Sequence, residues 1–421
     1  MVNSKKILLI FSVNFLKHDK GCSNAVYIPV KILKSLGFSI DLFSISKHED
    51  FSDFSFYNKD NLIENLYLDG IKTNYLLEKQ NRKIFKKNIL TKLFNFIIRI
   101  IKKIYRAITL QKFFLYPNSY VSYTLIKRFQ KIIKSNNYNY IYVHYIHWAD
   151  LFRYSNIPEN TKLIYNMHDS HFIQQLYFNQ IKIKNIGKAF MNELNALKYF
   201  HRYICISFDE MLFWSKLLPN REFYFCPPVN QINRTPHNNK NIDVLYLGAL
   251  NPFNIEGVCW FLDEVFPLLN KNISITFCGK FLSGLESSYI EKIRKNNIKT
   301  IDFAEDLRDL YTKTKIAIIP ILNGTGIKIK TIEALSYSIP VVSTLLGVDG
   351  FPDKFESGCL VSNNPVKFAS YIENLLGSNE YYEEIINKQT AYFNKYFSYE
   401  RSKSIIEEVF SENNDNTLNV I

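Results

Sequence analysis

Residues 320–335 read Pro-Ile-Leu-Asn-Gly-Thr-Gly-Ile-Lys-Ile-Lys-Thr-Ile-Glu-Ala-Leu and are the most informative segment of the chain. It follows an apolar run at 316–319, which predicts a buried strand, and leads into a predicted helix at 330–337. A strand that ends in a Gly-x-Gly loop before a helix presents backbone N–H groups and the positive end of the helix dipole. Lys328 and Lys330 add cations, so the stretch indicates a diphosphate-binding loop, although an ordinary tight turn has the same pattern.

Glu333 lies on the first turns of that predicted helix. A carboxylate at this position can accept two hydrogen bonds from a ribose diol, or it can simply counter the helix dipole. Together with the glycine loop, it favours a ligand that contains both a diphosphate and a ribose.

Outward from the loop, apolar runs alternate with helix-compatible segments along the chain. In the second half we predict strands at 243–247, 274–277, near 301, 316–319 and 341–342, and helices at 255–269, 306–311 and 330–337. In the first half we predict strands at 7–11, 38–45, 140–143, 163–166 and 203–206, and a helix at 25–36. Between the halves, residues 227–242 are polar and rich in asparagine, which is typical of a surface linker.

This order of elements predicts an α/β fold of two consecutive doubly wound, Rossmann-like domains that face each other across a cleft. In such domains ligands bind outside the carboxyl ends of the parallel strands. We therefore expect the functional site between the two sheets.

The composition is that of a folded protein, and the net positive charge comes from one segment of the chain. Of the 421 residues, 47% are hydrophobic and 22% are charged, which excludes wholesale disorder and a polytopic membrane protein. The net charge of +13 comes from residues 79–149, which hold 15 Lys or Arg and no Asp or Glu. The six cysteines are dispersed, without the spacing of zinc ligands or paired thiols, so we expect a reducing, cytoplasmic location.

The N-terminal segment has Lys5 and Lys6 before an apolar run at 7–13. We interpret this run as a buried strand rather than a signal peptide, because it is short and no small-residue cleavage site follows. No stretch reaches the roughly 18 apolar residues that a membrane-spanning helix needs.

Five motifs of the second half closely resemble, in order and spacing, the donor domain of family 4 glycosyltransferases of the GT-B fold. They are Gly-Ala-Leu-Asn-Pro-Phe-Asn-Ile-Glu at 248–256, Trp-Phe-Leu-Asp-Glu-Val-Phe-Pro at 260–267, Phe-Cys-Gly at 277–279, Ala-Glu-Asp-Leu-Arg at 304–308, and the block at 324–344. The resemblance implies a domain that binds a nucleotide diphosphate sugar. It implies donor contacts from Gly248 near the phosphates, Ala304 and Asp306 near the base, Gly324, Thr325, Gly326, Lys328 and Lys330 around the diphosphate, and Glu333 on the ribose.

The first half resembles the acceptor domain of the same family more loosely. Gly21 lies where the family's glycine-rich loop approaches the donor phosphates, and Tyr-Asn-Met-His-Asp at 165–169 matches a strand that ends in a histidine. The resemblance implies that His168 faces the reacting sugar, while Asp169 either assists it, orients the acceptor, or is only a turn or helix cap. We interpret His144, His147 and His171 as ordinary loop residues.

We place the acceptor domain at 1–235, with a basic insertion at about 79–134, and the donor domain at 240–395. Phe-Ser-Tyr-Glu at 397–400 precedes a segment that in the family crosses back. The resemblance therefore implies that the helix at 396–421 packs on the first domain.

One position departs from the family pattern. Many members have a second glutamate eight residues before the ribose-binding one, and here that residue is Thr325, which leaves the donor sugar open. The chain has no Asp-x-Asp motif, so we expect no cofactor and no metal ligands, with Lys328, Lys330 and the loop amides as the candidates that neutralise the leaving diphosphate. We expect His168, Asp169 and Lys328 to be the catalytic residues, and the resemblance implies retention of the anomeric configuration.

Residues 89–105 of the basic insertion place apolar side chains along one face of a predicted helix and mostly basic side chains off it. Such a helix suits an anionic membrane surface, although a core-facing helix with a basic solvated face has the same pattern. The basic segment has no motif typical of nucleic-acid-binding domains, so we do not expect a nucleic-acid partner.

The sequence thus predicts a cytoplasmic, hexosyltransferase-like enzyme that is peripheral at the inner face of the cell membrane. We expect it to move a sugar from a nucleotide diphosphate sugar to a glycan or lipid-linked acceptor of a surface polysaccharide or glycolipid. Thr325 motivates one alternative, a non-catalytic GT-B module that binds a nucleotide or a partner enzyme at the membrane. A GT-B enzyme of another reaction, such as epimerisation, is a further alternative.

Overall fold

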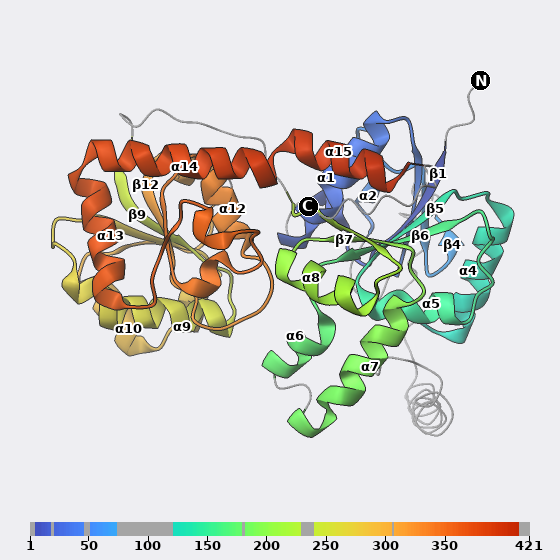
Figure 1. Cartoon of the computed structure of the whole chain (residues 1–421), viewed down its shortest axis with the longest axis horizontal. Helices are drawn as coiled ribbons and strands as arrows, with labels where there is room; N and C mark the ends of the chain where they lie inside the picture. Colours follow the sequence, from blue (N-terminus) through green and yellow to red (C-terminus); the bar gives the residue numbers. More distant parts are fainter. Residues whose placement is uncertain are drawn as a thin grey trace, which may run out of the picture.

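The computed structural model describes residues 5–17, 21–45, 51–73, 121–178, 182–228, 240–304 and 307–411. These residues form two α/β domains that lie side by side, the first on the right of Figure 1 and the second on the left. Each domain is built on one sheet with helices on its faces, as the alternating pattern predicts. The basic helix predicted at 89–105 lies outside the described residues.

The first sheet has the strand order β4-β3-β2-β1-β5-β6-β7-β8, and only the β3–β4 pair among the described strands is antiparallel. The strands are β1 (Lys6–Ile10), β2 (Ser39–Ser44), β3 (Asn65–Leu68), β4 (Ile71–Lys72), β5 (Tyr140–His144), β6 (Lys162–Met167), β7 (Arg202–Cys205) and β8 (Glu222–Phe225). Because β1, β5 and β6 are parallel neighbours, their carboxyl ends lie together at one edge of the sheet. Ligands of doubly wound folds bind at this edge.

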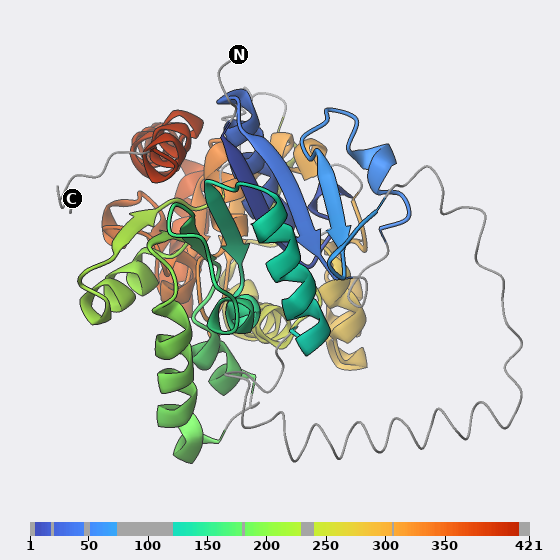
Figure 2. The ribbon, with the colours of Figure 1, turned by 90° about the vertical axis from the view of Figure 1, so that its right-hand side faces the viewer.

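Helices cover both faces of the first sheet. They are α1 (Gly21–Ser35), α2 (Phe54–Tyr57), α4 (Tyr123–Ser135), α5 (Ala149–Arg153), α6 (His171–Tyr177), α7 (Ile186–Leu197) and α8 (Phe208–Leu217). The helix α4, which Figure 2 shows in front of the sheet, buries a stripe of apolar residues that includes Leu125, Phe129 and Ile133. These positions recur every four residues, so the stripe stays on the face that meets the sheet. On the opposite face, α1 packs through Val26 and Val30.

The second sheet has the order β11-β10-β9-β12-β13-β14 and is parallel throughout its described strands. Its strands are β9 (Ile242–Leu247), β10 (Ile275–Cys278), β11 (Lys299–Ile301), β12 (Thr314–Ile319), β13 (Val341–Ser343) and β14 (Leu360–Val361). Its helices are α9 (Pro252–Trp260), α10 (Ser287–Lys295), α11 (Leu307–Thr312), α12 (Ile329–Ser336), α13 (Pro365–Gly377) and α14 (Asn379–Phe397).

The helix predicted at 255–269 differs from the one observed. It begins at Pro252, and after Trp260 it continues as a π-helical turn (Phe261–Val265) and a 3₁₀ turn (Phe266–Leu268). Pro267 has no backbone N–H with which to continue the α-helical ladder, which explains why regular helix ends before it. The short strands β3, β4, β8 and β14 also lie outside the predicted set, because they span only two to four residues.

The last helix, α15 (Tyr399–Val409), belongs to the core of the first domain. In Figure 1, α14 runs along the top of the second domain and α15 continues over the first. Ile406, Val409 and Phe410 join the apolar cluster of β1 and α1, and the Tyr140 hydroxyl donates a hydrogen bond to the Phe410 carbonyl at 2.7 Å. The chain therefore crosses between the domains twice.

None of the helices in the described parts of the chain is both long and apolar enough to cross a membrane.

Candidate active site

The two domains meet where the N-terminus of α8 contacts a loop of the second domain. The Phe208 amide donates to the Gly350 carbonyl at 2.9 Å, and the Gly350 amide donates to Asp209 Oδ2 at 3.1 Å. Lys354 lies 3.5 Å from the same carboxylate oxygen. These contacts hold the carboxyl edges of the two sheets close to each other.

The glycine loop of the second domain lies directly against Asp169 of the first. Gly324 and Gly326 have φ values of +123° and +68°, which favour glycine. A Cβ atom added at Gly326 would lie 2.3 Å from Asp169 Oδ1, so only glycine allows this approach. The structure thus brings together the two segments that the sequence singles out in different domains.

Lys328 is the N-cap residue of α12 and binds its own loop. Its Nζ donates to the carbonyl oxygens of Thr325 at 3.0 Å and Gly326 at 2.6 Å. An ammonium group has three N–H donors. Two of them are used here, so one N–H of Lys328 has no partner among the described residues and can bind a ligand. Burial lowers the pKa of Lys328, and the charges of Asp349, Asp169 and Glu210 act in the opposite direction.

Lys330 has all three donors engaged within the second domain. Its Nζ lies 2.9 Å from Asn254 Oδ1, 3.0 Å from the Leu247 carbonyl oxygen and 3.3 Å from the Tyr246 hydroxyl. Burial, with a smaller contribution from Lys328, lowers the pKa of Lys330 to about 7. Lys330 therefore ties the start of α12 to the segment just before Gly248.

The remaining donor-side residues lie around this point. Gly248 packs closely on Gly279, whose added Cβ would lie 2.0 Å from the Gly248 carbonyl oxygen. Glu333 accepts a hydrogen bond from the Tyr311 hydroxyl at 3.1 Å, and burial raises the pKa of its carboxyl group. Ala304 is partly buried between β11 and α11, whereas Asp306 lies outside the described residues. Gly21 is the first residue of α1, which follows β1 at the edge that also carries His168.

His168 is paired with a second buried histidine. His168 follows β6, and its Nε2 lies 2.9 Å from Nδ1 of His144, the last residue of the neighbouring strand β5. The Tyr145 ring, at a backbone φ of +69°, stacks on His168 with 4.4 Å between centroids. Burial lowers the pKa of His168 to about 4 and that of His144 well below its ordinary value. Both rings are therefore neutral near pH 7.

The pairing indicates the tautomer of His168. Nε2 of His144 is buried without a hydrogen-bond partner among the described residues. An orphaned buried N–H is rarer than an orphaned acceptor, so we assign the proton of His144 to Nδ1, from which it donates to His168. His168 then keeps its own proton on Nδ1 and is a hydrogen-bond donor at that atom.

Two buried glutamates hold the segment that carries His168 and Asp169. Glu193 of α7 accepts hydrogen bonds from the amides of His171 at 2.8 Å and Phe172 at 2.6 Å. Glu210 of α8 accepts from the Ser170 amide at 3.1 Å. Burial raises the pKa of Asp169 to about 6, of Glu193 to about 7 and of Glu210 to about 8, and the negative charge of Asp169 adds to the effect on both glutamates.

We expect Glu210→Gln to change the pH dependence of stability in a defined direction. The folded protein holds the Glu210 proton up to about pH 8, whereas the unfolded chain releases it near the ordinary glutamate pKa of 4.5. The folded state thus binds more protons in this window, so this group makes stability fall as the pH rises. The substituted glutamine keeps an acceptor for the Ser170 amide and cannot ionise.

The measurement is the free energy of unfolding in urea at about pH 5 and about pH 9. From about pH 5 to about pH 9, we expect the free energy of unfolding of the wild type to fall relative to that of the variant by at least about 1.4 kcal/mol, the equivalent of one pKa unit. The exposed residue Glu286 provides a control, Glu286→Gln. An equal shift in both variants would contradict the buried, protonated Glu210.

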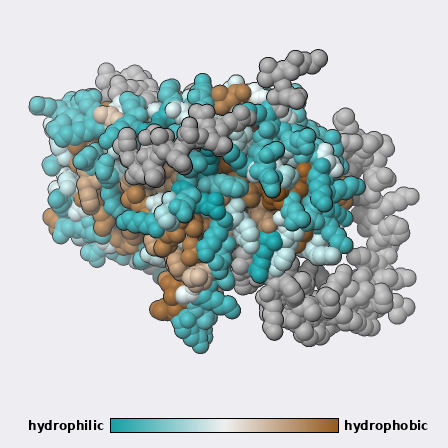
Figure 3. All heavy atoms as spheres, turned by 45° about the vertical axis from the view of Figure 1, so that its right-hand side comes forward, coloured by the Kyte–Doolittle hydropathy of each residue, from teal (hydrophilic) through white to brown (hydrophobic). Residues whose placement is uncertain are grey.

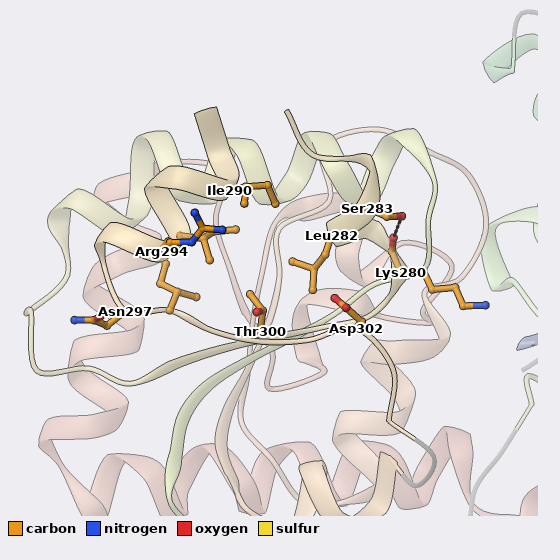
Figure 4. A pocket seen from close by; sticks show the side chains of 10 residues that line it. Lys280, Leu282, Ser283, Ile290, Arg294, Asn297, Thr300 and Asp302 are labelled. Carbon is orange, nitrogen blue, oxygen red and sulfur yellow. Dashed lines mark hydrogen bonds between the residues drawn. The ribbon is translucent and has the colours of Figure 1, made fainter. Parts of the chain in front are cut away.

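Each domain contains a cavity. A groove of about 680 Å³ runs along β11 beneath α10, and Figure 4 shows Lys280 and Asp302 at one end and Asn297 at the other. Its Asp302 end lies two residues before Ala304, near the carboxyl ends of β10 and β11. In the first domain, a smaller cavity of about 90 Å³ is lined by Tyr145, Ile146, His147, Tyr165, Asp169, His171 and Gln174.

No three His, Cys, Asp or Glu side chains are arranged to hold a metal ion within the described ranges. Metal independence stays a prediction of the sequence. The structure offers Lys328 and the glycine loop as positively polarised groups at the same place.

The comparisons with known proteins agree with this architecture. Residues 241–378 match the family model described as Glycosyl transferases group 1. Over 301 residues, 68% of this chain and 77% of the relative, the sequence is 25% identical to an uncharacterized 44.6 kDa protein in the cps region of Klebsiella pneumoniae.

Solved structures match nearly the whole chain. A complex of Anabaena HepE with UDP covers 97% of this chain and 100% of its own, with a TM-score of 0.64 and 12% identity. A Staphylococcus aureus TarM complex with UDP gives the same coverages and TM-score at 11% identity. The match with the sucrose-phosphate synthase of Thermosynechococcus elongatus covers 97% of this chain and 98% of that one, with a TM-score of 0.62 and 13% identity. The chain therefore has the GT-B fold, as the sequence predicts, and residues 241–378 of its second domain match the glycosyl transferases group 1 model.

Sequence reasoning missed several residues of this site. It interpreted His144 as an ordinary loop residue, whereas the structure pairs it with His168. A signal was present, because His144 follows an apolar strand just as His168 does. Glu193 and Glu210 gave no such signal, because they lie on separate helices and only the fold brings them to Asp169.

Proposed function

We propose that this protein is a retaining glycosyltransferase that moves a sugar from a nucleotide diphosphate sugar to a glycan or lipid-linked acceptor. The observation that carries the proposal is the contact between the Gly326 loop, with Lys328, and the edge that holds Asp169 and His168. A diphosphate bound at the loop would place its sugar toward His168. The family model that matches the second domain and the solved GT-B complexes with UDP support the same assignment.

The chemistry follows from these positions. Negative charge grows on the diphosphate as its bond to the sugar breaks, and a preorganised cation stabilises that charge in the transition state. Lys328 has one N–H donor that is not committed to a described residue, and the loop amides lie beside it. In the proposed mechanism these groups take the role that a metal ion has in other transferases. His168 donates from Nδ1 to a hydroxyl of the sugar or acceptor, and Asp169 orients the attacking hydroxyl.

The acceptor is proposed to be a precursor of a surface polysaccharide or glycolipid. The relative in the cps region of Klebsiella pneumoniae supports this class. The small cavity beside Tyr145 and Gln174 lies on the acceptor side of Asp169 and suits a polar group. We place the protein in the cytoplasm at the inner surface of the membrane, where lipid-linked precursors are available.

The test is a donor screen with purified protein. UDP-, GDP-, dTDP- and ADP-sugars are incubated singly, and free nucleoside diphosphate is measured. We expect slow release from one donor, loss of release in Glu333→Ala, and unchanged release in Glu286→Ala, whose side chain is exposed on the same domain. Nucleotide binding without turnover, even with membrane extract added, would overturn the transferase and favour the non-catalytic binding module.

A further inference from the structure

The helices α6 and α7 form a hairpin that projects from the first domain. In Figures 1 and 2 this hairpin extends below the rest of the described chain. The described parts, residues 171–178 and 182–197, are named the prong here. At its base the prong is anchored, because Phe172 packs on Phe190 with 5.4 Å between ring centroids.

The tip of the prong exposes apolar side chains. Ile183 is 78% exposed, and Tyr177 and Phe178 at the end of α6 are exposed by 42% and 45%, while Met191, next to Phe190 in α7, is exposed by 46% further along the prong. Figure 3 shows brown, hydrophobic atoms on the lowest coloured projection of the molecule, next to teal ones. Single exposed apolar residues are ordinary, but several together on a projecting element mark an interaction surface.

The charged side chains near the tip are all positive. Lys182, Lys184 and Lys188 are exposed there, and the sequence holds no Asp or Glu from Ser170 to Asn192. None of the three lysines has an ion-pair partner among the described residues. A convex surface with exposed apolar side chains and uncompensated lysines fits an anionic lipid surface better than it fits a protein groove.

The prong connects this surface to the site. The helix α6 begins three residues after His168, and its seven residues span about 10 Å. At its far end, Phe178 contacts Phe253 of the second domain with 5.5 Å between ring centroids. A membrane bound at the tip of the prong would therefore be separated from the cleft by about the length of α6.

We propose that the prong docks the protein on an anionic membrane, with Ile183 and its apolar neighbours at the acyl boundary and the lysines on lipid phosphates. Docking in this orientation would present the cleft to the head group of a membrane lipid. Delivery of a lipid-linked acceptor rests on the proposed function, whereas membrane docking does not.

Vesicle flotation of the full chain tests the proposal. The probes are phosphatidylcholine vesicles with and without phosphatidylglycerol. We expect wild type to float only with the anionic vesicles, and the triple variant Lys182→Glu, Lys184→Glu, Lys188→Glu to bind at least about tenfold more weakly. Ile183→Ser should weaken binding as well. The triple reversal of the exposed lysines Lys271, Lys299 and Lys367, and the exposed Val366→Ser, are the matched controls.

Two results would overturn the proposal. Either wild type does not bind anionic vesicles, or the prong variants bind like their controls while reversal of Lys92, Arg99, Lys102 and Lys103 in the basic insertion removes binding. Thermal unfolding checks that the variants are folded, and nucleoside diphosphate release from a soluble donor is measured in parallel. If the wild-type protein binds the vesicles but releases no nucleoside diphosphate from any donor, the result contradicts the proposed transferase activity and still supports docking by the prong.

Discussion

Lys328→Met is expected to lower kcat/KM for the donor by about 10²–10³-fold, because a cation aimed at developing charge is among the largest contributions to transition-state stabilisation. Within the described chain, the Lys328 Nζ donates to the carbonyls of Thr325 and Gly326 alone, so its third N–H is available to the leaving diphosphate. Methionine keeps the length of the side chain and removes the charge. The measurement is initial-rate kinetics of nucleoside diphosphate release.

Lys330→Met is the matched control for this prediction. All three donors of Lys330 are used by Asn254, Leu247 and Tyr246, so its loss leaves buried acceptors unpaired at a cost of about 1–3 kcal/mol. We expect this variant to lower the melting temperature more than Lys328→Met does and to lower kcat less. The opposite order of effects would show that Lys330, rather than Lys328, contacts the diphosphate.

His168→Ala is expected to lower kcat by about 10²-fold, the scale of a lost general acid–base or hydrogen-bonding group in the transition state. The donor KM should change little, since the diphosphate is bound by the other domain. Burial keeps His168 neutral above about pH 4, so the plot of kcat against pH should show no inflection from this residue near neutral pH.

A double-mutant cycle with His144 separates catalysis from packing. If His144 acts only by positioning His168 through their 2.9 Å contact, His144→Ala should lower kcat on its own but have no further effect in His168→Ala. Additive losses, or a His168→Ala variant with wild-type kcat, would contradict the assignment. Nucleotide binding and thermal unfolding show whether each variant is folded.

Much of the architecture could be predicted from local sequence. Apolar runs such as 7–11 and 316–319 became the central strands β1 and β12, because continuous apolar segments between turn signals satisfy both faces of a parallel sheet. The edge strands β4 and β14 have two residues each and depend on the neighbouring strand for their hydrogen bonds, so no local pattern marks them.

The candidate site could be predicted only in part. Gly324, Gly326, Lys328 and Glu333 form one continuous motif, and their positions around the start of α12 follow from the chain itself. The pairing of His144 with His168, and the support of Ser170 by Glu210, join residues 24 and 40 positions apart. Such contacts follow from the order of strands in the sheet and from helix packing, which a local pattern does not contain.

The residue pattern alone indicates two doubly wound domains, a glycine loop with a lysine at the start of a helix, and one dense basic segment. These features are local, because they depend on apolar periodicity, on glycine at positive φ and on the order of charges along the chain. The folded chain adds that Lys330 uses all three of its donors while Lys328 uses two, that Asp169 contacts Gly326 of the other domain, and that Ile183 and the lysines beside it are exposed. The contact of Asp169 with Gly326 depends on how the two domains pack together, whereas the commitments of the two lysines and the exposure of Ile183 depend on packing within one domain.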